Sequence, residues 1–92
     1  MGKNEVVANV FDHKQKQIAR IALNGYNISP GGPLGQAGAM RSFRVLQGEG
    51  DLWDHWQVQT TFVVTSEDGR TSEAKVAAYP AEENGFGFIE FI

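Results

Sequence analysis

The feature that most constrains the fold is a run of alternating side chains in the second half of the chain. Over residues 56–64, mostly apolar positions alternate with polar ones. The first set comprises Trp56, Val58, Thr60, Phe62 and Val64, and the second comprises Gln57, Gln59 and Thr61. A period of two places successive side chains on opposite faces of a β-strand, so the run indicates a strand with one buried face. A second alternating stretch, with Ala74, Val76 and Ala78 on one face, follows a polar turn, and the two stretches predict an antiparallel hairpin.

The apolar faces of these two stretches fix the register of the hairpin. A two-residue turn would set Phe62 opposite a lysine and mix buried with exposed positions. A three-residue loop ending at Gly69 instead pairs Phe62 with Ala74. The same register pairs Val58 with Ala78. We therefore predict this register, with Gly69 at the left-handed position that such loops require.

Three other segments are predicted to be strands. Val6, Ala8 and Val10 share one face of a first strand, and residues 40–47 resume the alternation. Residues 86–92 form the last strand and carry apolar side chains on both faces. Because a strand of that kind is usually covered on both sides, we expect it to lie in the interior.

Residues 13–23 are open to two interpretations. Asp12 and Gln15 match a helix capping box, and the residues that follow include good helix formers. Alternatively, a polar turn leads into a second strand whose alternate residues, from Ala19 onward, face inward. Only a narrow apolar stripe would lie on the helix, so we predict the hairpin and keep the helix as the alternative.

These elements together predict the fold class. The 92 residues are enough for one domain, spanning 1–92. We expect a mainly β fold, a small antiparallel sandwich or partly open barrel of five to six strands. The alternative is an α+β fold in which one helix at 13–23 packs on an antiparallel sheet.

A Gly/Pro-rich segment, residues 24–39, interrupts the regular elements. Its five glycines and two prolines exclude a helix or a central strand. It lacks the Gly-Lys-Ser/Thr ending of a phosphate-binding loop, so it does not predict a nucleotide site. A segment of this length is often functional, and Tyr26, Ile28 and Leu34 would be its apolar anchors on a partner.

No set of residues predicts catalysis, a metal ion or a cofactor. Asp51, Asp54 and His55 lie close together, and so do Asp12 and His13, but neither group has the spacing of metal ligands. The serines lack the context of a nucleophile elbow. We therefore expect a protein that is not an enzyme and that needs no metal or cofactor.

Two tryptophans supply a large share of the apolar surface. Residues 48–51 are predicted to be a turn, and the segment after it leads into the alternating strand. In an extended chain Trp53 and Trp56 would point to opposite faces, and Trp56 is in phase with the core. Trp53, flanked by Asp51 and Asp54, then suits a protein interface, where tryptophan is enriched.

Charge divides unequally between the two halves of the chain. Residues 1–46 carry six basic and two acidic side chains, whereas residues 47–92 carry nine acidic and two basic ones. The balance is +4 in the first half and −7 in the second. Charge fields of this kind steer partners rather than build folds.

Our leading hypothesis is a small non-catalytic binding protein that occludes or bridges a macromolecular partner, a protein or ribonucleoprotein with a basic surface. Inhibitors of the immunity or anti-defence type act in this way. Its expected contacts are Glu49, Asp51, Trp53 and Asp54 with the anchors Tyr26, Ile28 and Leu34.

The alternative is a β module or ribonucleoprotein component that contacts nucleic acid directly. Its contacts would come from the basic half, namely Lys14, Lys16, Arg20, Arg41 and Arg44. The chain has no cysteine, no secretory signal and no apolar run long enough to span a bilayer. We therefore expect a cytoplasmic protein that acts without a membrane.

Overall fold

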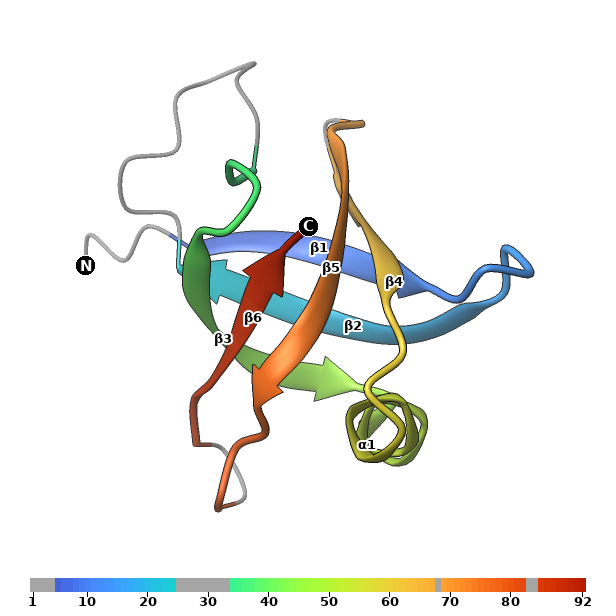
Figure 1. Ribbon diagram of the computed structural model, residues 1–92, viewed down its shortest axis with the longest axis vertical. Coiled ribbons are helices and arrows are strands. Elements are labelled where there is room, and N and C mark those ends of the chain that lie inside the picture. The colour runs from blue at the N-terminus through green and yellow to red at the C-terminus, as the bar shows by residue number, and fades with distance from the viewer. Residues whose placement is uncertain (1–4, 25–33, 68, 83–84) are drawn as a thin grey trace.

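The computed structural model describes residues 5–24, 34–67, 69–82 and 85–92. Within these residues the chain forms strands and one short helix (Figure 1). In chain order the elements are β1 (Glu5–Phe11), β2 (Gln17–Asn24), β3 (Met40–Gln47), α1 (Glu49–Gln57), β4 (Phe62–Ser66), β5 (Thr71–Ala78) and β6 (Gly87–Phe91). The fold is mainly β, as the sequence predicts.

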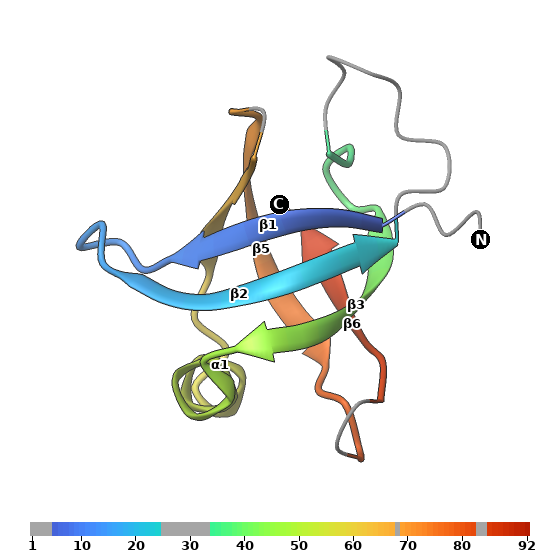
Figure 2. The ribbon, with the colours of Figure 1, turned by 180° about the vertical axis from the view of Figure 1, so that it is seen from behind.

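The strands close into an antiparallel barrel in the order β1-β2-β3-β6-β5-β4. Two meanders, β1-β2-β3 and β4-β5-β6, meet at two seams, where β1 pairs with β4 and β3 pairs with β6. Figures 1 and 2 show the barrel from opposite sides, with α1 at one end of it. The predicted small antiparallel barrel is confirmed, and it is closed rather than partly open.

The alternative helix over 13–23 is wrong, because Gln17–Asn24 is strand β2. This strand pairs with β1 on one side and β3 on the other. Its inward side chains Ile21 and Leu23 are fully buried. A helix here would leave both neighbouring strands without partners for their backbone groups, which is costly inside a barrel.

The register predicted for the β4–β5 hairpin is confirmed at its centre and wrong at its far end. Phe62 lies opposite Ala74, and Gly69 has a φ of 92°, as the three-residue loop requires. The expected pair of Val58 and Ala78 does not form, because Val58 is the C-cap residue of α1. The strand therefore begins at Phe62 rather than at residue 56.

Helix α1 replaces the turn and the strand entry predicted for residues 48–56. Gly48 precedes it in the left-handed conformation, with a φ of 85°. A Cβ at Gly48 would collide with the backbone of Ile18 and Ala19, so the close approach of the chain to β2 also requires glycine. Leu52 and Trp56, four residues apart on the helix, both face the barrel.

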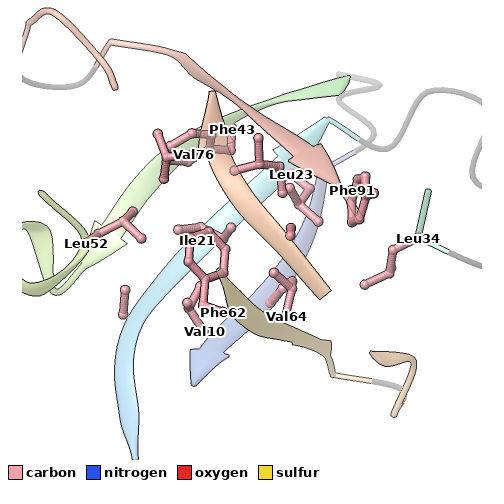
Figure 3. Close-up of a cluster of buried hydrophobic side chains, with 14 of the residues drawn as sticks. Val10, Ile21, Leu23, Leu34, Phe43, Leu52, Phe62, Val64, Val76 and Phe91 are labelled. Carbon is pink, nitrogen blue, oxygen red and sulfur yellow. The ribbon is translucent and has the colours of Figure 1, made fainter. Parts of the chain in front are cut away.

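The core fills the barrel from end to end. Figure 3 shows Leu52 of α1 and Leu34 at opposite ends of the buried cluster, with Ile21 and Phe62 between them. Both leucines are fully buried. A barrel has two open mouths, and each of these side chains excludes water from one of them.

Strand β6 is covered on one face only, contrary to expectation. Its inward residues Ile89 and Phe91 are buried, whereas Phe86 is 61% and Phe88 is 45% exposed. Because β6 pairs with both β3 and β5, it lies in the middle of a barrel wall. A barrel wall has one interior side, and no described element covers the outer one.

Candidate partner-binding site

Helix α1 carries an exposed tryptophan, Trp53, at one end of the barrel. The helix packs against β5 and β2 at one end of the barrel (Figure 1). Its buried face holds Leu52, and Trp56 is partly buried against the same core. Trp53, which follows Leu52 in the chain, remains 44% exposed.

Trp53 is held by two other aromatic rings. Its centroid lies 4.9 Å from that of Trp56 and 5.1 Å from that of Tyr79, and both contacts are edge-to-face. Trp56 and Tyr79 stack on each other at 5.6 Å. These are the favoured arrangements of aromatic pairs, and Tyr79 is itself packed against the core. The three rings touch directly, so they form a fixed surface rather than a cage around a ligand.

This arrangement corrects the expected placement of the two tryptophans. Trp53 and Trp56 do not point to opposite faces, because residues three apart on a helix are neighbours. Trp56 contributes to the edge of the core, as expected, and Trp53 lies beside it. The sequence contained a signal for this outcome: Leu52 and Trp56 have the four-residue spacing of a buried helical face.

The acidic residues predicted to flank Trp53 belong to the same helix. Asp54 is exposed and adjacent to Trp53 in the chain. Glu49 and Asp51 occupy the first turn of α1, where acidic residues complement the helix dipole. The side chains of Glu49 and Asp51 lie outside the described part of the structure. Within the described part, Trp53 and Asp54 are the predicted contacts on α1 whose side chains are exposed.

The anchors predicted in the Gly/Pro-rich segment do not join this surface. Tyr26 and Ile28 lie outside the described residues. Leu34 is fully buried at the opposite mouth of the barrel, close to Phe91 (Figure 3). Its role is therefore in the core, because burial leaves no surface for a partner to contact.

Arg41, predicted as a nucleic-acid contact, makes hydrogen bonds to the backbone of its own chain. Its Nε donates to the Leu34 carbonyl at 3.1 Å, and its Nη1 donates to the Asn24 carbonyl at 2.7 Å. Partial burial lowers the pKa of Arg41 below its usual range. One guanidinium thus ties together the two ends of the segment 25–33.

Two other predicted phosphate contacts are paired with acids. Arg20 meets Glu67 at 2.9 Å, which joins the basic half of the chain to the acidic half. Arg44 makes a two-pronged contact with Glu5, at 2.9 and 3.0 Å. The Glu5 carboxylate raises the pKa of Arg44 through this hydrogen bond and through its charge.

The Arg44–Glu5 pair also explains a buried residue on the outer wall. Glu5 belongs to β1 and Arg44 to β3, so the pair spans β2 between them. Ala22 of β2 lies beside Arg44 in the ladder and is only 2% exposed, although its neighbours along the strand point into the core. The small side chain of Ala22 leaves room for the ion pair to pass above it.

Lys14 and Lys16 are exposed in the turn between β1 and β2. Asp12 organises this turn, because its Oδ1 accepts hydrogen bonds from the backbone N–H groups of both lysines at 2.9 Å. The Lys16 N–H, followed by that of Lys14, lowers the pKa of Asp12. Neither lysine makes an ion pair within the described residues.

A polar cluster that sequence reasoning missed lies beside this turn. Thr61 donates its hydroxyl proton to Glu73 at 2.9 Å, and His13 Nε2 lies 2.8 Å from the same hydroxyl oxygen. Because the threonine proton is directed to the carboxylate, the imidazole must be the donor in its contact. His13 therefore does not act as a base on Thr61 in this arrangement. The three residues are 48 and 12 positions apart in sequence, so no local motif could reveal them.

Two further observations bear on what the site could hold. Among the described residues, no three His, Asp or Glu side chains are grouped so that they could bind a metal ion. The same residues include no helix of the length and apolar character needed to cross a membrane. We found no family model that matches the sequence, and no curated protein or solved structure with detectable similarity to it.

Proposed function

We propose that this protein is a non-catalytic binding protein that acts in the cytoplasm by occluding or bridging a macromolecular partner. Its contact surface is the exposed side of α1, centred on Trp53 and Asp54. Inhibitors of the immunity or anti-defence type are the class of protein that works in this way. The partner is a protein or ribonucleoprotein with a basic surface.

The fixed orientation of Trp53 carries this proposal. Tryptophan is enriched among the residues that dominate binding energy at interfaces. Trp53 is 44% exposed, yet two edge-to-face contacts hold its ring in place. A side chain that is already ordered loses little conformational entropy when a partner binds, and this raises affinity.

The charge of α1 supports a basic partner. Asp54 is exposed beside Trp53, and Glu49 and Asp51 belong to the same nine-residue helix. Complementary charge accelerates encounter and disfavours partners of the same sign. Arginine is the partner side chain best suited to this surface, since its guanidinium both stacks on an indole and pairs with a carboxylate.

The arginine contacts favour this function over direct binding of nucleic acid. Arg20 and Arg44 are paired with acids, and Arg41 is bound to two carbonyls. A phosphate backbone would have to displace these contacts before it could use the arginines. Lys14 and Lys16 alone would give a weak site with a shallow salt dependence, because the slope scales with the number of phosphates that are neutralised.

The proposal is tested by affinity capture from the native host followed by mass spectrometry. The tagged wild-type protein is compared with Trp53→Ala, with Asp54→Lys and with the control Val58→Ser. Val58 is 69% exposed at the C-cap of the same helix, so its variant removes exposed apolar surface without touching the aromatic cluster. We expect a specific partner to be retained by the wild type and by Val58→Ser. The other two variants should bind it at least about tenfold more weakly.

Asp54→Lys protects the test against misfolding. Trp53→Ala removes two ring contacts and could lower stability, whereas Asp54 is exposed and its replacement should leave the thermal unfolding midpoint unchanged. Equal capture by all four proteins would refute the proposal. Capture that disappears after nuclease treatment would favour the nucleic-acid alternative instead.

A further inference from the structure

The exposed face of α1 includes a glycine, Gly50, in addition to Trp53 and Asp54. Residues three and four apart on a helix are neighbours, so Gly50 lies beside both of these residues. Gln57 continues the same face at the end of the helix. All four are exposed, whereas Leu52 on the other side of the helix is fully buried. In Figures 1 and 2 none of the described elements covers this face.

The fold does not require a glycine at position 50. The backbone of Gly50 is helical, whereas Gly48 has a φ of 85°. Apart from its chain neighbours and the helix backbone, a Cβ built on Gly50 would meet no described atom within 4 Å. A Cβ on Gly48 would collide with strand β2. Glycine is also the poorest helix former after proline. Backbone conformation and packing therefore explain Gly48 and do not explain Gly50.

Gly50 leaves the helix backbone bare beside Trp53. Every Cα–Cβ bond of a helix tilts toward its N-terminus, so that of Trp53 is directed toward the turn that contains Gly50. Ring contacts with Trp56 and Tyr79 hold the indole in place. Because position 50 has no side chain, a group of the partner can lie against the backbone there and touch the indole. A residue that breaks a local propensity rule without a structural reason is a candidate for a functional role.

The chemistry around Gly50 favours a cation. Helix α1 carries three acidic residues and neither lysine nor arginine. One of the acids, Asp54, lies next to Gly50 on the exposed face and makes no ion pair within the described residues. His55 lies on the side toward the barrel, where its ring contacts Phe62. An indole face attracts a cation through its quadrupole, and a carboxylate attracts the same cation through its charge.

We infer that Gly50 is the point at which an arginine side chain of the basic partner crosses α1. The flat guanidinium lies on the bare turn, between the indole of Trp53 and the carboxylate of Asp54. A guanidinium suits this position better than a lysine ammonium, because it is planar, weakly hydrated and stacks on aromatic rings. Gly50 thus determines specificity, since a larger residue would occupy the place of the guanidinium. This inference rests on the proposed function and names the side chain through which the partner binds.

Hexa-arginine and hexa-lysine peptides test the inference, because they have equal charge and differ in the cationic group. NMR titration of the isotope-labelled protein at low salt follows the backbone amide of Gly50 and the indole N–H of Trp53. We expect hexa-arginine to shift both signals. Hexa-lysine should bind this face about two- to fivefold more weakly, the factor that a cation–π contact at an exposed site supplies.

The variant Gly50→Ala should lower the affinity for hexa-arginine to that for hexa-lysine, with the indole N–H as the reporter. Alanine is the better helix former and has open space at this position, so the thermal unfolding midpoint should not fall. The matched control is Gln57→Ala, which places an alanine on the same face without filling the space over Gly50. It should bind hexa-arginine as tightly as the wild type does.

Several outcomes would overturn the inference. These are an absence of shifts at Gly50 and Trp53, equal affinities of the wild type for the two peptides, a Gly50→Ala variant that binds hexa-arginine normally, and a control that is weakened equally. The proposed function is tested separately by capture from the native host. Capture that depends on Trp53 and Asp54 but is unchanged in Gly50→Ala would keep that function and refute the role of Gly50. Selective binding of hexa-arginine without a captured partner would refute the function and keep the arginine site.

Discussion

A single side chain, Asp12, decides the conformation of the residues that sequence analysis left between helix and strand. An aspartate before a helix accepts hydrogen bonds from the next backbone N–H groups, and so does an aspartate that closes a turn. In the structure Asp12 accepts from Lys14 and Lys16, and Gln15 adopts a φ of 68°. A left-handed residue at this point ends any helical path. The local pattern of Asp12 and Gln15 could not distinguish these outcomes.

The lowered pKa of Asp12 predicts a pH-dependent contribution to stability. The folded protein keeps this carboxylate ionised to lower pH than the unfolded chain, whose ordinary pKa is 3.8. Its stabilising effect is therefore present above that pH and is lost as the pH falls through the folded-state value. The variant Asp12→Asn should have a lower thermal unfolding midpoint than the wild type at neutral pH. The two midpoints should converge in acid.

Thermal unfolding followed by circular dichroism between about pH 2 and pH 7 checks this prediction. The asparagine keeps an oxygen acceptor for the turn but carries no charge, so it mimics the protonated aspartate. If the unfolding midpoints of the two proteins differed by the same amount at every pH, the ionised Asp12 carboxylate would not be the cause of the difference.

The arginines show why the charge pattern along the chain is an incomplete guide to a surface. Arg20 and Glu67 belong to opposite halves of the sequence, yet they meet at 2.9 Å. Arg41 donates hydrogen bonds to two backbone carbonyl groups of its own chain. The sequence separates into a basic and an acidic half, but in the folded protein some charges of one half are paired with charges of the other. Pairing across the barrel depends on strand order, which local charge does not encode.

At the scale of elements, alternation predicted the strands, whereas the only signal for the helix was the four-residue spacing of Leu52 and Trp56. Alternation identified the strands on either side of Gly69 because their buried faces repeat every two residues. Residues 56–60 continue the same alternation by letter, but Trp56 belongs to α1. The helix forms because the end of the barrel requires an apolar cover, which Leu52 supplies. That requirement arises from the closure of the barrel. The nine residues of the helix, taken by themselves, do not reveal it.

Leu52 is therefore predicted to contribute strongly to stability. It is fully buried, and Leu52→Ala should lower the free energy of unfolding by about 2–5 kcal/mol through lost burial and a cavity. Leu34→Ala, at the other mouth, should have an effect of the same size. Denaturant unfolding measures both.

Leu46→Ala is the matched control for these two variants. Leu46 is 36% exposed on β3, so its truncation should cost less than about 1 kcal/mol. If Leu52→Ala cost no more than Leu46→Ala, α1 would not be the cover of this mouth.

At the scale of the whole molecule, the mainly β class of the fold could be predicted from the sequence. The closure of the barrel could not. The seams that close it pair Phe11 with Val63 and Ser42 with Phe88, which are 52 and 46 positions apart. No alternation pattern selects such partners. The expected covering of both faces of β6 failed for the same reason, since a strand in a barrel wall has only one interior side. The candidate contacts Trp53 and Asp54 were identified from the sequence, but their place on a helix was not.

The hydrogen bonds of Arg41 have a practical consequence for engineering. Asn24 and Leu34 are held to one guanidinium, so the distance between them does not depend on the residues that join them. Doubling the length of segment 25–33 with a Gly/Ser insert should then cost only about 0.6 kcal/mol of unfolding free energy, the entropy of a longer loop. Denaturant unfolding of the extended protein checks this, and a loss of several kcal/mol would contradict it. This small barrel could thus display a foreign peptide opposite the mouth that α1 closes.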